Sequence, residues 1–204
     1  MIRLFVGLAL PEEVRLRLAR LGGGVPGARW APAANFHITL RFIGEVDEGL
    51  AQDIDMALET VASPPFPLAL SGLGSFGKGH RTHTLWAGVE RNEALHHLRD
   101  RVESALVRAG LPAEERKFSP HVTLARLGDA KADKLARFLE EQGLYHDGPI
   151  LVDRFVLFES VLGKGGPVYH ALRTYLLGAR RWADAGDEPD ADADQGADGE
   201  ERGA

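Results

Sequence analysis

Two segments of the chain carry a histidine followed two residues later by a threonine within the same apolar frame. The tetrapeptide His-Ile-Thr-Leu at residues 37–40 recurs as His-Val-Thr-Leu at residues 121–124. Histidine is the only side chain whose ordinary pKa lies near neutrality, so two imidazoles can donate and accept protons at working pH. Threonine hydroxyls can donate hydrogen bonds to the non-bridging oxygens of a phosphate. The repeat therefore predicts one active site, built from two matching halves, for acid and base chemistry on a phosphodiester.

The spacing within each tetrapeptide fits a strand with one polar and one buried face. Successive side chains of a strand alternate between its faces, so His37, Thr39 and Arg41 are expected on the polar face of the first segment. His121 and Thr123 are expected on the polar face of the second segment. A single copy would be better explained by an edge strand with a solvated polar face, but the matched pair favours an active site.

Arginine side chains near the two tetrapeptides could stabilise negative charge on a phosphate, because a guanidinium group binds phosphate through two parallel hydrogen bonds. Arg41 and Arg126 follow the two segments closely and are the candidates. Simple alternation places Arg126 on the face opposite His121. Arg126 therefore requires a β-bulge or a strand end to reach the site.

The remaining histidines offer a metal site as the alternative chemistry. A third His-x-Thr pattern, at residues 80–82, lacks the apolar frame and is interpreted as a coincidence within a loop. His96 and His97 are adjacent, so on a helix they point about 100° apart and cannot easily share one ion. No His-Glu-x-x-His pattern or acidic cluster accompanies either tetrapeptide. We therefore expect chemistry without a metal or another cofactor.

Composition indicates an ordinary globular domain followed by an acidic tail. The chain has 204 residues, no cysteine and a net charge of −6. Residues 183–204 hold nine acidic residues and one arginine, so they carry −8 and residues 1–182 carry +2. We expect a domain of residues 1–178 and a disordered, solubilising tail of residues 179–204. No leader peptide or membrane span is evident, which predicts a cytoplasmic protein, and we expect a monomer.

Hydrophobic periodicity predicts helices and strands in alternation, with the strands in the majority. Helices are expected over residues 11–21, 47–61, 92–109 and 132–142, and strands over residues 3–10, 37–44, 68–71, 84–89, 121–126, 150–160 and 168–177. Loosely, one helix accompanies each His-x-Thr strand in each half of the chain. This order predicts an α+β protein of two related lobes, each a mainly antiparallel sheet with outer helices, whose polar faces meet in a central cleft.

The sequence around both tetrapeptides resembles a known family. Residues 35–45 and 118–126 are similar to the paired motifs of the 2H phosphoesterases, most of all the bacterial branch called 2′-5′ RNA ligase or RNA 2′,3′-cyclic phosphodiesterase. Residues 3–8, 74–77, 85–89 and 158–160, together with Tyr169, also fit that branch. The resemblance covers about residues 1–178.

The resemblance implies a metal-independent hydrolase that opens a terminal 2′,3′-cyclic phosphate on RNA, or on a nucleotide, and leaves a 2′-phosphate. It implies that His37 donates a proton to the leaving 3′ oxygen and that His121 accepts a proton from water. The residues alone do not separate these roles, because the two motifs are nearly identical. The runner-up activity is 2′-5′ RNA ligation, in which a 5′-hydroxyl replaces water.

A non-catalytic RNA-binding module is the alternative from another functional class. Aromatic side chains can stack on bases, and Phe42, Phe76 and Tyr169 are the candidates for a nucleotide contact. By alternation Phe42 belongs to the buried face of its strand, so packing in the core is the competing interpretation. Binding alone does not require two His-x-Thr copies, which favours the enzyme.

Overall fold

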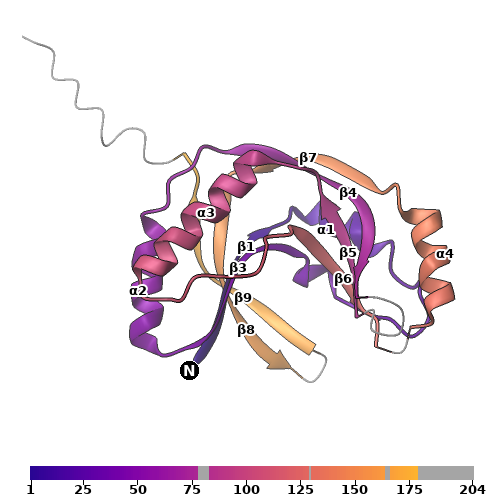
Figure 1. The fold of residues 1–204 in the computed structure, drawn as a ribbon, viewed down its shortest axis with the longest axis horizontal. Helices are drawn as coiled ribbons and strands as arrows, with labels where there is room; N and C mark the ends of the chain where they lie inside the picture. The colour runs from indigo at the N-terminus through magenta and orange to yellow at the C-terminus, as the bar shows by residue number, and fades with distance from the viewer. Residues whose placement is uncertain (78–82, 129, 164–165, 179–204) are drawn as a thin grey trace, which may run out of the picture.

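The computed structural model describes residues 1–77, 83–128, 130–163 and 166–178 (Figure 1). The third His-x-Thr pattern and the acidic tail of residues 179–204 lie outside the described residues. The described part consists of strands and helices in alternation, with a short 3-10 helix labelled η1. In chain order the elements are β1 (Ile2–Ala9), α1 (Glu12–Ala19), β2 (Arg29–Trp30), η1 (Ala33–Asn35), β3 (His37–Val46), α2 (Glu48–Glu59), β4 (Phe66–Phe76), β5 (Thr84–Val89), α3 (Glu93–Arg108), β6 (His121–Arg126), α4 (Ala132–Gln142), β7 (His146–Val152), β8 (Arg154–Gly163) and β9 (Gly166–Leu176).

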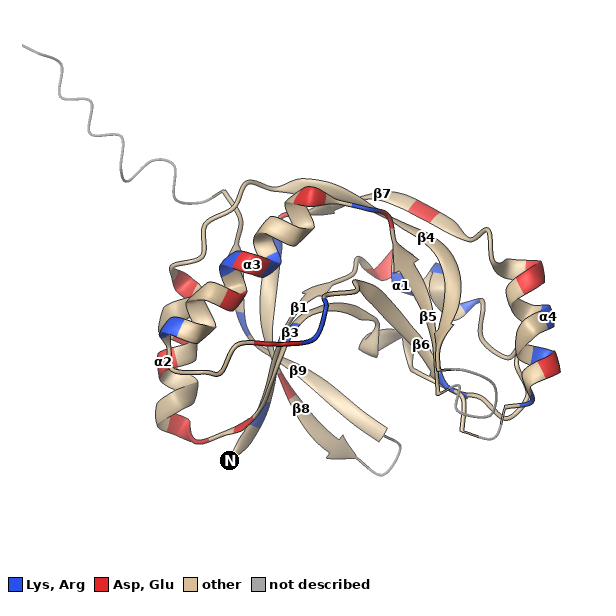
Figure 2. Cartoon of the chain, in the orientation of Figure 1, with Lys and Arg blue, Asp and Glu red and all other residues tan. Residues whose placement is uncertain are grey.

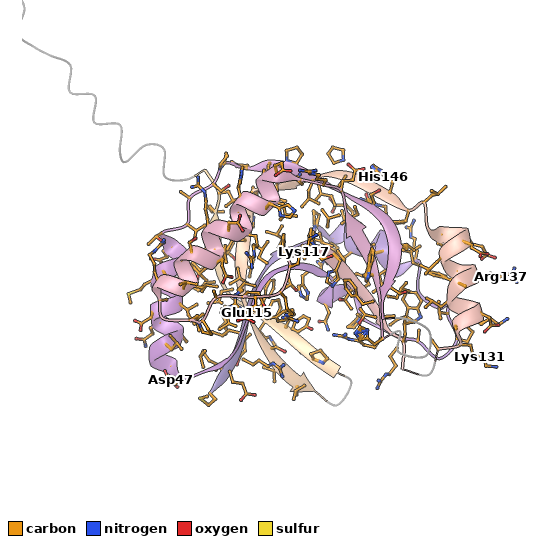
Figure 3. The ribbon with its side chains drawn as sticks, viewed as in Figure 1. Asp47, Glu115, Lys117, Lys131, Arg137 and His146 are labelled. Atoms are coloured by element: carbon orange, nitrogen blue, oxygen red, sulfur yellow. The ribbon has the colours of Figure 1, made fainter. Side chains whose placement is uncertain are left out.

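The helices α2 and α3 begin at short polar side chains that cap them. The Asp47 side chain accepts a hydrogen bond of 2.8 Å from the backbone N–H of Leu50 at the start of α2 (Figure 3). Asn92 accepts a bond of 3.0 Å from the N–H of Leu95 at the start of α3. All four predicted helices are confirmed, and α4 matches the predicted range in full.

The predicted strand over residues 150–160 is wrong, because two strands occupy this range and separate at Asp153. β7 pairs with β4, whereas β8 pairs with β1 and β9. The Asp153 carbonyl accepts a hydrogen bond of 2.7 Å from the Leu177 N–H, which holds the crossing point. The apolar residues run on through this crossing, so hydrophobicity alone gives no sign of it.

The strands form one sheet in the order β7-β4-β5-β6-β3-β1-β8-β9, with β2 paired beside β6. Every pairing is antiparallel, so the predicted α+β class with a mainly antiparallel sheet is confirmed. The two related halves meet where β3 and β6 pair through Ile38 and Val122. The two His-x-Thr strands are therefore neighbours in the middle of a single sheet, and the halves are joined edge to edge.

The two faces of this sheet have different surroundings. One face packs its aliphatic residues, among them the fully buried Ile38 and Val122, into the main core with the helices. α3 packs against β3 and β4 on this side (Figure 1). On the opposite face Phe5, Phe158 and Tyr169 belong to a separate small cluster. A hairpin of β8 and β9 projects beyond the other strands and carries part of that cluster (Figure 1).

Candidate active site

The pairing of β3 with β6 brings both histidines to one face of the sheet. Ile38 and Val122 are partners in an antiparallel pair, so His37 lies towards Thr123 and Thr39 lies towards His121. Because both partners are buried in the core, the His and Thr side chains project from the opposite face. The structure thus gathers two imidazoles and two hydroxyls into one compact group, which we call the tetrad.

His37 is held by its own chain. Its Nδ1 lies 2.7 Å from the carbonyl oxygen of Asn35. A carbonyl can only accept, so Nδ1 carries the proton and donates it. The lone pair of neutral His37 is then on Nε2, which accepts a hydrogen bond of 3.1 Å from the Thr39 hydroxyl. The 3-10 turn that ends at Asn35 therefore fixes both the tautomer and the orientation of the ring.

His121 is held in the same way. Its Nδ1 donates a hydrogen bond of 2.7 Å to the carbonyl oxygen of Ser119, again two residues earlier in the chain. Nε2 of His121 is accordingly the atom that is free to exchange a proton with a ligand. In both halves of the molecule, a hydrogen bond from Nδ1 to a carbonyl two residues earlier therefore leaves Nε2 facing the site.

Aromatic rings surround both imidazoles. Around His37, ring-centroid distances are 4.8 Å to Phe5 and 5.0 Å to Tyr169. Around His121 they are 4.8 Å to Phe76 and 6.4 Å to Trp86. Burial lowers the pKa of His37 below its ordinary value, and the nearby charge of a protonated His121 lowers it further. Burial also lowers the pKa of His121, and the positive charge of Arg126 adds to this effect.

A β-bulge at the leucine of each tetrapeptide decides which arginine reaches the site. In β3, Thr39 lies opposite Gly7 and Arg41 lies opposite Val6, so Leu40 is the extra residue. In β6, Thr123 lies opposite Trp86 and Ala125 opposite Leu85, which makes Leu124 the extra residue. A bulge puts two consecutive residues on the same face and reverses the alternation that follows. The fifth residue after each histidine therefore shares the face of that histidine.

Arg126 occupies this position in β6, so the β-bulge that its side chain required is present. Its guanidinium donates a hydrogen bond of 2.9 Å to the hydroxyl of Thr84 on β5. The Thr84 residue is almost fully buried. The positive charge of Arg126 lowers the pKa of both His121 and Tyr169. Arg126 is thus a cation close enough to the tetrad for its charge to act on His121 and on Tyr169.

Arg41 lies on the other face, so the expectation that it shares the polar face of His37 is wrong. The bulge at Leu40 turns its side chain towards α3, where Nε donates to Glu103 at 2.7 Å. Its guanidinium also donates to the carbonyl oxygens of Phe42 and Pro112. With 9% of the side chain exposed, Arg41 fastens the segment that precedes β6.

We predict that Arg41→Gln acts on stability. Removing the cation leaves the carboxylate of Glu103, only 13% exposed, without its closest partner, which lowers the free energy of unfolding by about 3 kcal/mol. Denaturant unfolding measures this loss, and kcat at a temperature where the variant is folded stays close to that of the unchanged protein. Unchanged stability together with a large fall in kcat would show instead that Arg41 serves the phosphate.

The three aromatic candidates all lie on the tetrad face. Phe42 is the fifth residue after His37, is 54% exposed and contacts Phe5 at a centroid distance of 5.9 Å. The interpretation of Phe42 as a core residue is therefore wrong, for the same reason that Arg41 is displaced. Phe76 lies at the end of β4 beside His121, and Tyr169 lies on β9 with its ring edge-on to His37.

Several residues that shape the site lie in segments that resemble the family, but no particular role could be assigned to them from the sequence. The side-chain amide of Asn35 donates a hydrogen bond of 2.7 Å to the Pro167 carbonyl, which ties β9 to the turn before His37. Gly7 lies opposite Thr39, and a Cβ there would approach the Ile38 carbonyl oxygen to 2.9 Å. Phe5 comes from the first strand of the chain. Such contacts depend on which strands become neighbours, and spacing along the chain does not encode that.

Neither a cluster of metal ligands nor a membrane-spanning helix occurs in the part of the chain that the structure describes. There, His, Asp and Glu side chains form no group of three or more that could hold a metal ion. Within the same ranges, no helix combines the length and the apolar character needed to cross a membrane.

Two histidines and two threonines on neighbouring antiparallel strands, within this α+β fold, define a 2H phosphoesterase. The family model of the 2′-5′ RNA ligase superfamily matches residues 10–163. The chain is 39% identical to an RNA 2′,3′-cyclic phosphodiesterase of Aeropyrum pernix, over 76% of its own length and 92% of that relative. It is 30% identical to a protein of the same name from Thermotoga maritima, over 84% and 93% of the two chains.

A solved structure leads to the same family. The crystal structure of E. coli LigT complexed with 3′-AMP is similar with a TM-score of 0.71 and 27% sequence identity, over 87% of this chain and 98% of that one. The chain belongs to the 2′-5′ RNA ligase superfamily.

Proposed function

We propose that the protein hydrolyses the terminal 2′,3′-cyclic phosphate of RNA and leaves a 2′-phosphate. Support comes from the relatives named RNA 2′,3′-cyclic phosphodiesterase and from the tetrad, which presents two Nε2 atoms on one face. Water attacks phosphorus, and its proton passes to Nε2 of His121. The bond between phosphorus and the 3′ oxygen breaks, and that oxygen receives the proton of His37. A proton is thus accepted on one side and donated on the other.

The single observation that carries this assignment of roles is the position of Arg126. Its positive charge disfavours protonation of His121, since it lowers the pKa of that ring. A general base must be neutral when the reaction begins, and the charge of Arg126 favours the neutral form of His121. Burial and the charge of a protonated His121 lower the pKa of His37, but no arginine acts on it. Its partner Thr39 can accept a hydrogen bond from a protonated Nε2 as well as donate one to a neutral ring. The geometry thus favours His121 as base and His37 as acid.

The two bulges give the halves of the site different tasks. Arg126 and Phe42 occupy matching positions, five residues after His121 and His37. Arg126, Thr39 and Thr123 stabilise the phosphate oxygens, on which charge develops during the reaction. Phe42, Tyr169 and Phe76 contact the nucleotide, because exposed aromatic rings stack on bases.

The pH dependence of the proposed reaction follows from burial of both rings. The profile of kcat/KM reports the free enzyme, in which His121 must be neutral and His37 protonated. Because the pKa of each ring is lowered, both limbs of the bell lie below the ordinary histidine value, and the maximum falls below about pH 6.5. Initial rates measured at constant ionic strength test this. A rate that is flat between about pH 5 and 9 contradicts paired histidine catalysis.

The direct test is to supply an oligoribonucleotide that ends in a 2′,3′-cyclic phosphate, in the presence of a chelator. We expect complete conversion to the 2′-phosphate. Phosphorus NMR identifies this isomer, and the product resists a phosphatase that removes only 3′-phosphates. A 3′-phosphate product, or turnover that the chelator abolishes, would overturn the proposal.

Ligation is the second candidate, and the description of the matching family model favours it. The chemistry is the same, with a 5′-hydroxyl in the place of water. Adding an oligonucleotide with a free 5′-hydroxyl to the same assay shows whether a 2′-5′ linkage forms. Since His37, His121 and Arg126 all come from one chain, we also propose that the monomer of residues 1–178 is the active unit and that residues 179–204 are a tail outside it.

A further inference from the structure

Two arginines face one another across neighbouring strands beside the tetrad. Arg29 on β2 is the direct partner of Arg126 on β6 in an antiparallel pair. Paired residues in such a ladder project from the same face, so Arg29 shares the face of Arg126 and of the tetrad. Like charges placed directly opposite each other destabilise a sheet. Among the described residues, no carboxylate forms an ion pair with Arg29 or Arg126. The repulsion between the two guanidinium groups would therefore be relieved by an anionic ligand.

The two guanidinium groups extend the tetrad along β6. His121 and Thr123 come first on this face, and Arg126 follows after the bulge. The guanidinium of Arg29 then lies over Gly128, with an Nη atom 3.7 Å from the position that a Cβ of Gly128 would take. Arg29 is thus further from the histidines than Arg126 is, in the same direction along the strand.

Most of the other arginines that the structure describes are paired with carboxylates, whereas Arg29 and Arg126 are not. Charged residues of both signs lie along α3 and α4, whereas the charged residues of α2 are all acidic (Figure 2). On α4, Arg137 points outward from the molecule and pairs with Glu141 at 2.7 Å (Figure 3). On β9, Arg173 pairs with Asp55 and Glu59 of α2. The unpaired cations on the tetrad face therefore mark an anion-binding track.

We infer that Arg29 binds the internucleotide phosphate that precedes the terminal nucleotide, so that the site recognises an RNA strand and not a mononucleotide alone. This inference rests on the proposed function. Arg126 serves the cyclic phosphate, because its charge acts on His121 and Tyr169. A single strand of RNA offers its next negative charge one nucleotide away, and Arg29, one strand further out, is placed to meet it. The ligand class is thus an oligoribonucleotide with at least one internal phosphodiester.

The test compares substrates that differ only in the internal charge. The three substrates are a nucleoside 2′,3′-cyclic phosphate, a dinucleotide ending in that group, and the same dinucleotide with a neutral methylphosphonate linkage. We expect the unchanged enzyme to favour the charged dinucleotide over the other two by about tenfold in kcat/KM. In Arg29→Gln this preference disappears. The salt dependence for the charged dinucleotide also becomes shallower, by about 0.7 in the slope of log kcat/KM against log salt.

Controls separate the inference from the activity on which it rests. Arg137→Gln removes a surface cation far from the tetrad and leaves the preference intact. If the unchanged enzyme hydrolyses all three substrates equally, or if Arg29→Gln lowers all three rates by one factor, the inference is overturned while the proposed function stands. If none of the three is hydrolysed, the proposed function itself has failed.

Discussion

Replacing either tetrad histidine with alanine is expected to lower kcat/KM for a 2′,3′-cyclic phosphate by about 1,000-fold, because each ring moves one proton in the transition state. The loss should fall mainly on kcat, since hydroxyls and Arg126 still hold the phosphate. The double variant His37→Ala/His121→Ala should lose little more than either single variant, as expected of groups that act as one unit. Steady-state kinetics and equilibrium binding of a nucleoside 2′-phosphate separate catalysis from binding.

A leaving group that needs no proton distinguishes the acid from the base. Bis-(para-nitrophenyl) phosphate releases a stable anion, so His37→Ala should retain most of its activity on this substrate, whereas His121→Ala should remain impaired. His97→Ala, an exposed histidine on α3, is the matched control and should behave as the unchanged protein. If the His121 variant were rescued and the His37 variant were not, the roles would be reversed.

Arg126→Gln is expected to lower kcat about 100-fold, because a preorganised cation that faces developing charge contributes strongly in a partly buried site. A second effect has a definite sign. Arg126 lowers the pKa of His121, so its removal raises that pKa and moves the acid limb of the kcat/KM profile to higher pH. The two effects are measured in one set of pH–rate curves.

Thr84→Val provides the comparison for Arg126. This change removes the hydroxyl that holds the guanidinium at 2.9 Å but keeps the charge. We expect a smaller loss of kcat and an acid limb that stays in place. An Arg126→Gln variant with unchanged kcat would show that the cation does not touch the reacting phosphate.

Much of the fold could be predicted from the sequence because local chemistry determines it. Asp47 and Asn92 mark the starts of α2 and α3, and their side chains form the hydrogen bonds that cap these helices. The short strand β5 and the helix α4 stand out by their apolar periodicity. The change of direction at Asp153 was missed, because β7 and β8 are continuous in hydrophobicity and differ only in the strands that they join.

The candidate site shows where strand alternation fails. An extra residue directly after the threonine of each His-x-Thr strand, Leu40 in β3 and Leu124 in β6, exchanges the faces of the residues that come next. Arg41 therefore leaves the site for a buried pair with Glu103, and Phe42 enters it. A leucine in a β-bulge is the same residue type as a leucine in a regular strand, so the sequence does not reveal the bulge. The register with the neighbouring strand is what reveals it, and that register is a tertiary property.

The central claim is that His37 and His121 act on one and the same phosphate. NMR of the histidine rings tests it most directly, with a nucleoside 2′-phosphate titrated into the protein and each ring signal assigned by its alanine variant. We expect the signals of both rings to move together with a single Kd, and we expect the bound anion to raise the pKa of both rings. A ligand that perturbs one ring alone, or two rings with clearly different Kd values, would contradict it.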